Sequence, residues 1–183
     1  MKKFIFILLS VISINCNAQR IISDDTLFNS ICERCEKTYK VETICPSENN
    51  MYIHYIVKPN VKLLLSKINN NISIATIYFT DNDDYANAYL SHYSLKLKNL
   101  YGKPIHIDYE ENNTNCELSK YTVLFDKNHE IGVSISTLMM DKSDFTSSSF
   151  KNNQIYAIHV GIDFLDTNNI DFNEINNILE IEL

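Results

Sequence analysis

Residues 81–101 carry the apolar pattern that most constrains the fold of this chain. Five side chains recur there at alternating intervals of four and three residues: Ala86, Leu90, Tyr93, Leu97 and Leu100. This spacing places them on one stripe of an amphipathic helix. Asp81 is placed to cap the start of that helix, and Gly102 followed by Pro104 ends it. The pattern predicts a long helix that buries one side against another layer.

The segments around this helix predict strands. Alternating or β-branched patterns cover residues 39–45, 51–57, 72–80, 105–110, 121–126, 130–138 and 155–164. Residues 61–68 fit either a short helix or a strand. Apolar spacing predicts shorter helices over residues 23–37 and 172–179, the second with Asp171 and Glu174 arranged as a capping box. Residues 139–154 form a Ser-rich and Asn-rich loop that is long for a hairpin connection.

This irregular order of strands and helices predicts an α+β fold. We expect a mostly antiparallel sheet packed on a long central helix, with short N- and C-terminal helices. A doubly wound parallel fold would need regular alternation of strand and helix, which the last three strands do not supply. No internal repeat is visible in the sequence.

Residues 1–18 are typical of a secretory signal peptide. Lys2 and Lys3 precede an apolar run, and Ala18 offers a small-residue cleavage site. The apolar run is too short to span a bilayer, so no transmembrane helix is expected after processing. Cleavage would leave one domain, residues 19–183, exported to the periplasm or the extracellular space. The alternative is a lipid anchor at Cys16, although Asn15 is bulkier than the residue that precedes the cysteine in lipoprotein signals.

The charge and the glycine content exclude several classes of function. Residues 19–183 hold 14 basic and 23 acidic side chains, a net charge of −9, which disfavours binding to nucleic acid or anionic lipid. Gly102, Gly132 and Gly161 are too far apart to form a glycine-rich phosphate loop. We therefore expect neither a nucleotide cofactor nor a nucleic-acid partner.

Four cysteines remain after residue 18, and their even number in an exported chain favours disulfide bonds. Cys32 and Cys35 share one face of the predicted helix 23–37, so bridges from this pair to Cys45 and Cys116 are expected, in unknown order. The alternatives are a redox CxxC motif and a zinc site. A redox motif would begin its helix directly after a strand, and a zinc ribbon would need a second close cysteine pair.

Two His/Asp pairs are candidates for acid/base or metal chemistry. His106 with Asp108, and His159 with Asp163, lie on the less apolar faces of their strands. They would cluster if those strands paired, whereas the simpler interpretation is a solvated sheet face. No metal site is predicted.

Three further groups have weaker functional interpretations. Tyr85 and Tyr89 could form a patch for a partner, although core packing also explains tyrosines at this spacing. Asp81, Asp83 and Asp84 lack the glycine and closing glutamate of a calcium loop. The serines at 147–149 have no identified base to activate a nucleophile.

Export, one small acidic domain and the lack of a chemical motif together favour a non-catalytic binding or cell-envelope module. Its partner would be a protein or small ligand of unknown identity, and its oligomeric state is open. The alternative is a small exported hydrolase or a thiol-redox enzyme that uses the CxxC motif.

Overall fold

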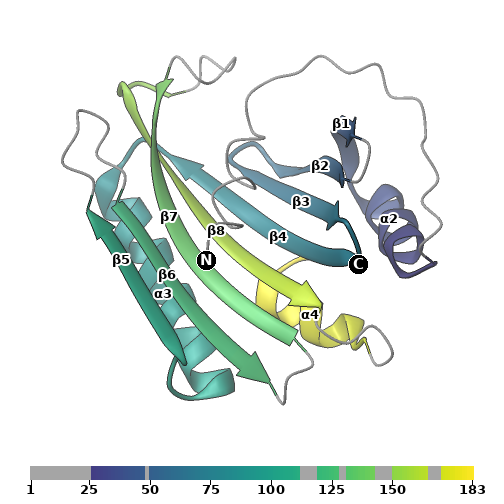
Figure 1. Cartoon of the computed structure of the whole chain (residues 1–183). Coiled ribbons are helices and arrows are strands. Elements are labelled where there is room, and N and C mark those ends of the chain that lie inside the picture. The colour runs from purple at the N-terminus through teal and green to yellow at the C-terminus, as the bar shows by residue number, and fades with distance from the viewer. Residues whose placement is uncertain (1–25, 48–49, 112–118, 128–130, 143–149, 165–169) are drawn as a thin grey trace.

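One antiparallel sheet organises the computed structural model, which describes residues 26–47, 50–111, 119–127, 131–142, 150–164 and 170–183 (Figure 1). Within these residues the sheet has eight strands in the order β1-β2-β3-β4-β8-β7-β6-β5. The strands are β1 (Lys40–Ser47), β2 (Asn50–Lys58), β3 (Val61–Ile68), β4 (Asn71–Thr80), β5 (His106–Glu111), β6 (Ser119–Lys127), β7 (Ile131–Asp141) and β8 (Gln154–Phe164). The helices are α2 (Thr26–Thr38), α3 (Asp83–Tyr101) and α4 (Phe172–Leu179).

All three helices pack on the same face of the sheet (Figure 1). Their buried side chains form one core with alternate residues of the strands. The strand residues of this core include Leu63, Leu65, Ile72, Ile74, Ile158, Val160 and Ile162. Because side chains alternate across a strand, the residues between these positions point to the opposite face of the sheet. We call that opposite face the second face.

Two successive parts of the chain have the same order of secondary-structure elements. A helix followed by four antiparallel strands occurs as α2 with β1–β4 and again as α3 with β5–β8. The sheet order places the last strands of the two units, β4 and β8, side by side at its centre. The first strands of the units, β1 and β5, lie at the two edges. The repeat is therefore one of topology, which sequence patterns did not show.

The prediction of a helix over residues 81–101 is confirmed except at its start. Asn82 is the N-cap, and its side chain accepts a hydrogen bond from the backbone amide of Tyr85 at 3.0 Å. Asp81, predicted as the cap, instead accepts bonds from the backbone amides of Lys151 and Asn152, at 2.6 and 3.0 Å. At the other end, Gly102 has φ 82°, a left-handed conformation that glycine adopts without strain.

The ambiguous segment 61–68 is a strand. Leu63 and Leu65 enter the core beneath the helices, whereas Leu64 lies on the second face. A strand buried on both faces reads as a continuous apolar run, which is why periodicity alone did not distinguish it from a helix. The predicted cap Asp171 is confirmed, with its carboxylate accepting bonds from the backbone amides of Asn173 and Glu174.

The α+β class and the antiparallel sheet are confirmed in coarse form. The sheet is larger than the predicted layer, and α3, with 19 residues, shares its face with two other helices instead of covering the sheet alone. Strand β7 extends to Asp141, so the predicted loop 139–154 begins later. No helix of the described segments is long and apolar enough to cross a membrane.

Candidate functional site

The second face carries a small pocket where four strands run side by side. In the sheet register, Ser73 of β4 lies opposite Asp163 of β8, and Ala75 lies opposite Gly161. Gly161 in turn lies opposite Ser134 of β7. These residues therefore meet on one face although they are up to 90 positions apart in the sequence.

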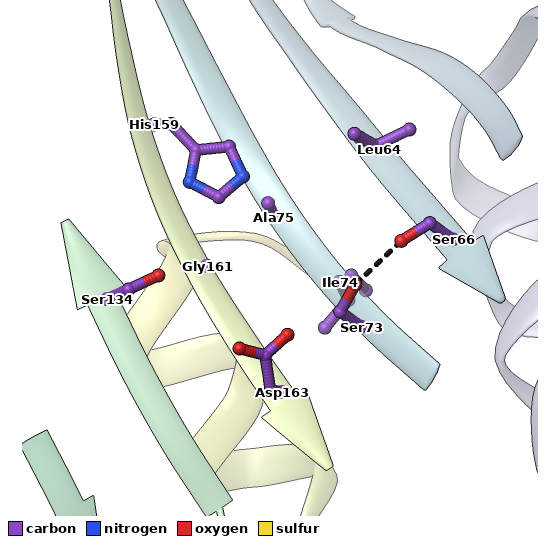
Figure 2. Close-up of a pocket in the computed structure, with 9 residues that line it drawn as sticks. All are labelled: Leu64, Ser66, Ser73, Ile74, Ala75, Ser134, His159, Gly161 and Asp163. Atoms are coloured by element: carbon purple, nitrogen blue, oxygen red, sulfur yellow. Dashed lines mark hydrogen bonds between the residues drawn. The ribbon is translucent and has the colours of Figure 1, made fainter. Parts of the chain in front are cut away.

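The pocket is a small cavity of about 10 Å³, which is the space of one water-sized group. Figure 2 shows its lining residues, which come from β3, β4, β7 and β8. They are Leu64, Ser66, Ser73, Ile74, Ala75, Ser134, His159, Gly161 and Asp163. We call this cavity the His159 pocket. The His159 ring and the Asp163 carboxylate lie at its two ends, with Gly161 between them (Figure 2).

Gly161 keeps the floor of the pocket open. A Cβ atom at this position would lie 2.5 Å from His159 Cε1, closer than carbon atoms can approach without a shift. The same atom would lie 3.3 Å from Ser134 Oγ. The imidazole therefore rests directly over the glycine backbone. A larger residue here would force the ring or the backbone to shift.

His159 is buried without a polar partner in the described structure. Its exposed fraction is 7%, and no hydrogen bond or ion pair joins it to another described residue. Burial lowers the pKa of His159 from 6.5 to about 4, because a charged imidazole is poorly solvated there. The ring is therefore neutral at pH 7 and offers one donor and one acceptor nitrogen.

Asp163 is the acidic group of the pocket. Burial raises its pKa from 3.8 to about 6, and no described cation forms an ion pair with it. Ser73, directly opposite, shares a 2.6 Å hydrogen bond with Ser66 (Figure 2). Keeping a partly desolvated, unpaired carboxylate ionised costs free energy. A hydrogen-bond donor or a cation near Asp163 would lower that cost.

A second buried histidine lies on the same face. His54 of β2 faces Leu64 in the register, and its exposed fraction is 4%. No described residue forms a hydrogen bond with its Nε2 atom. Burial, reinforced by the charge of Lys62, lowers the pKa of His54 to about 4. Lys62 itself pairs with Glu42 at 2.7 Å.

The apolar end of the second face is closed by Phe150. Its ring packs into a cluster with Leu64, Ile77, Phe79, Ile155 and Ala157. The backbone just beyond Phe150 is held by the Asp81 carboxylate through the amides of Lys151 and Asn152. Asp81 is thus an anchor for this segment. Leu64 belongs to both the apolar cluster and the His159 pocket, so the two adjoin.

The structure separates the two predicted His/Asp pairs. β5, which carries His106 and Asp108, lies at the sheet edge, and β6 and β7 stand between it and β8. His106 is exposed, so the expectation of a solvated position holds for that residue. For His159 the same expectation is wrong, because the second face is buried where it lies.

The predicted tyrosine patch divides into two different environments. Tyr85 is 64% exposed, whereas Tyr89 stacks on Tyr78 with ring centroids 4.3 Å apart. Tyr93 lies in the core and donates its hydroxyl to the carbonyl of Leu179 at 3.3 Å. Of the two predicted patch residues, Tyr85 is the exposed one and Tyr89 is partly buried.

The CxxC pair lies in the middle of α2 and faces the core, as predicted. Cys32 and Cys35 are buried, and burial raises the pKa of Cys35 to about 12. Cys45 follows the core residue Ile44 on β1, so it points to the second face, across the sheet from α2. Cys45 and the two helix cysteines therefore lie on opposite faces of the sheet, and the expected pairing with Cys45 remains a prediction.

In the described residues none of Cys32, Cys35 and Cys45 is in a disulfide bond. Cys116 and Cys16 lie outside the described residues, as do the serines at 147–149, so bonding to Cys116 and lipidation at Cys16 remain predictions. The described part of the chain contains no group of three or more metal-ligating side chains.

We expect Cys35 to resist alkylation in the native, reduced protein. A thiol with a pKa near 12 is ionised about 10³-fold less at pH 8 than an ordinary cysteine, and it is also sterically covered. Partly exposed Cys45 serves as the internal control. Iodoacetamide labelling followed by peptide mapping should modify Cys45 first. Rapid labelling of Cys35 would support a redox role for the CxxC motif.

Comparison of the chain with protein-family models, curated proteins and solved structures gave no match. The site therefore has to be interpreted from its own residues. Sequence patterns placed His159 and Asp163 on one face, but they missed Ser73, Ser134 and the role of Gly161. Only the pairing of β4 and β7 with β8 brings those residues to the pocket.

Proposed function

We propose that this protein is an exported, non-catalytic binding module whose ligand contacts the His159 pocket on the second face. The observation that carries this proposal is His159 itself, a neutral imidazole that has no hydrogen-bond partner among the described residues and rests over Gly161 at the edge of a cavity. No described residue forms a hydrogen bond with its ring nitrogens, and these nitrogens are not among the fully buried polar atoms, so they can be reached from the cavity. A bound ligand would supply that partner.

Binding is favoured over hydrolysis by the arrangement of the three reactive residue types. A serine nucleophile needs a base within about 3 Å, oriented by a third group. Ser134, His159 and Asp163 line one pocket, but no hydrogen bond joins any two of them in the described structure. The thiol-redox alternative is disfavoured by the buried, high-pKa Cys35.

Fragment binding tests the proposed site. Mature protein is titrated with mixtures of small amines, alcohols, acids and sugars while the His159 imidazole nitrogens and the Gly161 amide are followed by NMR. We expect at least one mixture to shift both signals. Gly161→Ala should abolish the shifts by displacing the ring, whereas Gly132→Ala should not, because its Cβ would meet only Asp163 Cβ at an ordinary 3.9 Å.

Two results would overturn the binding proposal. The first is that no mixture perturbs the second face. The second is turnover in a broad hydrolase and thiol-oxidoreductase screen that His159→Ala or Cys32→Ser removes. The fold of each variant is checked by circular dichroism, so that loss of a signal is not confused with unfolding.

Export is tested by the intact mass of the protein from its native envelope. The motifs in residues 1–19 favour cleavage after Ala18 and a mature chain that begins at Gln19. A diacylated chain that begins at Cys16 would instead place the binding module on a membrane surface. An unprocessed chain in the cytoplasm would contradict export altogether.

A further inference from the structure

Strand β5 is an open edge of the sheet. Among the described strands only β6 pairs with it. Every second backbone N–H and C=O group of an edge strand points away from its one neighbour and can pair with another chain. The register of β5 with β6 is continuous from His106 to Glu111, and no proline interrupts the strand. This edge therefore offers a regular row of hydrogen-bonding groups.

The opposite edge, β1, differs from β5 in two respects. Its register with β2 shifts between Val41 and Thr43, so the strand is irregular there. Pro46 lies within β1 and has no backbone N–H to donate. Both features discourage the addition of a strand at an edge. Of the two edges of the described sheet, β5 is therefore the one suited to accept a further strand.

Apolar side chains are exposed along the β5 edge. Ile105 and Ile107 have exposed fractions of 67% and 53%. The backbone amide of Ile105 donates to the carbonyl of Leu124 at 2.8 Å, so this residue continues the edge formed by β5. The register through β6 aligns Ile107 with the core residue Ile135 of β7, which places Ile107 on the helix face. Helix α3 packs mainly over β4, β6, β7 and β8, so an added strand would cover Ile107 where the helix does not.

The charge of β5 indicates what kind of strand it would accept. Its sequence, His-Ile-Asp-Tyr-Glu-Glu, contains three acidic residues and neither lysine nor arginine. In the register with β6, Glu110 lies opposite Lys120, whereas the other two acidic residues lie opposite Thr122 and Ser119. Like charges on adjacent strands are destabilising, and opposite charges are stabilising. A second copy of β5 would bring like charges together, whereas a basic strand would bring opposite charges together.

We infer that the β5 edge binds an extended segment of a partner protein, in which basic residues alternate with apolar ones. The segment would pair with β5 through its backbone, as an added strand. Its apolar residues would cover Ile105 and Ile107, and its basic residues would lie next to the acidic positions of β5. The sheet order places β6 and β7 between this edge and β8, so the inference does not depend on a ligand in the His159 pocket.

The test is an NMR titration of the mature protein with the peptide acetyl-Lys-Val-Lys-Val-Lys-Val-amide at constant ionic strength. We expect the amide signals of residues 105–111 to shift and the Gly161 signal of the His159 pocket to stay in place. The acidic peptide acetyl-Glu-Val-Glu-Val-Glu-Val-amide is the charge control and should bind at least about tenfold more weakly. The basic peptide with every amide N-methylated has no backbone donors and should not shift these signals.

Variants of the protein separate the contribution of charge from that of apolar contact. Asp108→Asn/Glu111→Gln should weaken binding of the basic peptide several-fold, because it removes two negative charges from the edge. Asp83→Asn/Asp84→Asn removes the same charge from exposed positions on α3 and should leave binding unchanged. Ile107→Thr keeps a β-branched residue but removes apolar surface, so it should weaken binding a few-fold. Circular dichroism checks that each variant is folded.

Three results would overturn the inference. The first is equal affinity for the basic and the acidic peptide. The second is the lack of any shift at residues 105–111. The third is concentration-dependent dimerisation in sedimentation equilibrium that Ile107→Lys abolishes, because it would assign this edge to a second copy of the chain.

Discussion

Lowering the pH from 7 to 4 will reduce the free energy of unfolding by about 4 kcal/mol, because His54 and His159 are buried as neutral rings and outweigh the opposing effect of Asp163. Burial lowers the pKa of each from 6.5 to about 4, so the unfolded chain takes up these protons first. Stability is fully present above pH 6.5 and is lost as the pH falls toward 4. Each histidine contributes about 3 kcal/mol to this loss.

Asp163 acts in the opposite direction. Its pKa is raised from 3.8 to about 6 in the folded protein, so its effect favours folding at low pH and is lost as the pH rises through 6. It offsets about 2 kcal/mol of the loss caused by the two histidines. The net acid destabilisation therefore depends on there being two buried imidazoles and only one such carboxyl.

Urea unfolding at several pH values measures this balance. The double variant His54→Gln/His159→Gln should lose most of the destabilisation between pH 6.5 and 4. His92→Gln is the control, since His92 is exposed and pairs with Glu180 at the surface. Parallel pH profiles for the double variant and the natural protein would show that the two rings are not the acid-sensitive groups.

Removing α4 will prevent the rest of the chain from folding cooperatively. Its segment buries Ile175, Ile178, Leu179 and Ile181 against the sheet. Complete burial of such side chains contributes about 1.5–3 kcal/mol each, so their sum approaches the whole stability of a typical domain. A chain ending at residue 169 should show no sigmoidal unfolding by circular dichroism in urea.

A single substitution in α4 tests the same prediction with a smaller expected effect. Ile178 is fully buried, so Ile178→Ala should lower the free energy of unfolding by about 2–5 kcal/mol. Glu180→Gln is the matched control. It removes surface bonds to His92 and Lys96, each 2.8 Å long, and should cost less than about 1 kcal/mol. A cooperative transition in the truncated chain would mean that α4 is an accessory to an independently stable sheet.

Elements with strong local signals were predicted well from the sequence. The stripe through Tyr93 and Leu97 specified α3 almost to its ends, and Asp171 marked the start of α4. Asp81 misled the prediction because its carboxylate bonds to a segment 70 residues away, which no local rule contains. The strands were located by their patterns, but their order was not, since the paired residues of β4 and β8 are 76 to 92 positions apart in the sequence.

Only part of the candidate site could be predicted from the sequence, because the rest depends on contacts between distant segments. Residues 159 and 163 are separated by four positions on one strand, so their shared face follows from period two. The depth of burial does not follow from spacing, because it depends on what packs over and beside a face, including Phe150. Gly161 was noted only as an isolated glycine. Its function as the floor beneath an imidazole appears only in three dimensions.

The duplicated topology has a consequence for how a ligand would be sensed. The pocket straddles the seam between the two helix-plus-four-strand units, since Ser73 and Ala75 belong to the first and Gly161 and Asp163 to the second. Neither unit alone contains all the lining residues of the pocket. A ligand bound as proposed would contact both units at once, so binding is expected to slow hydrogen exchange along the paired strands β4 and β8.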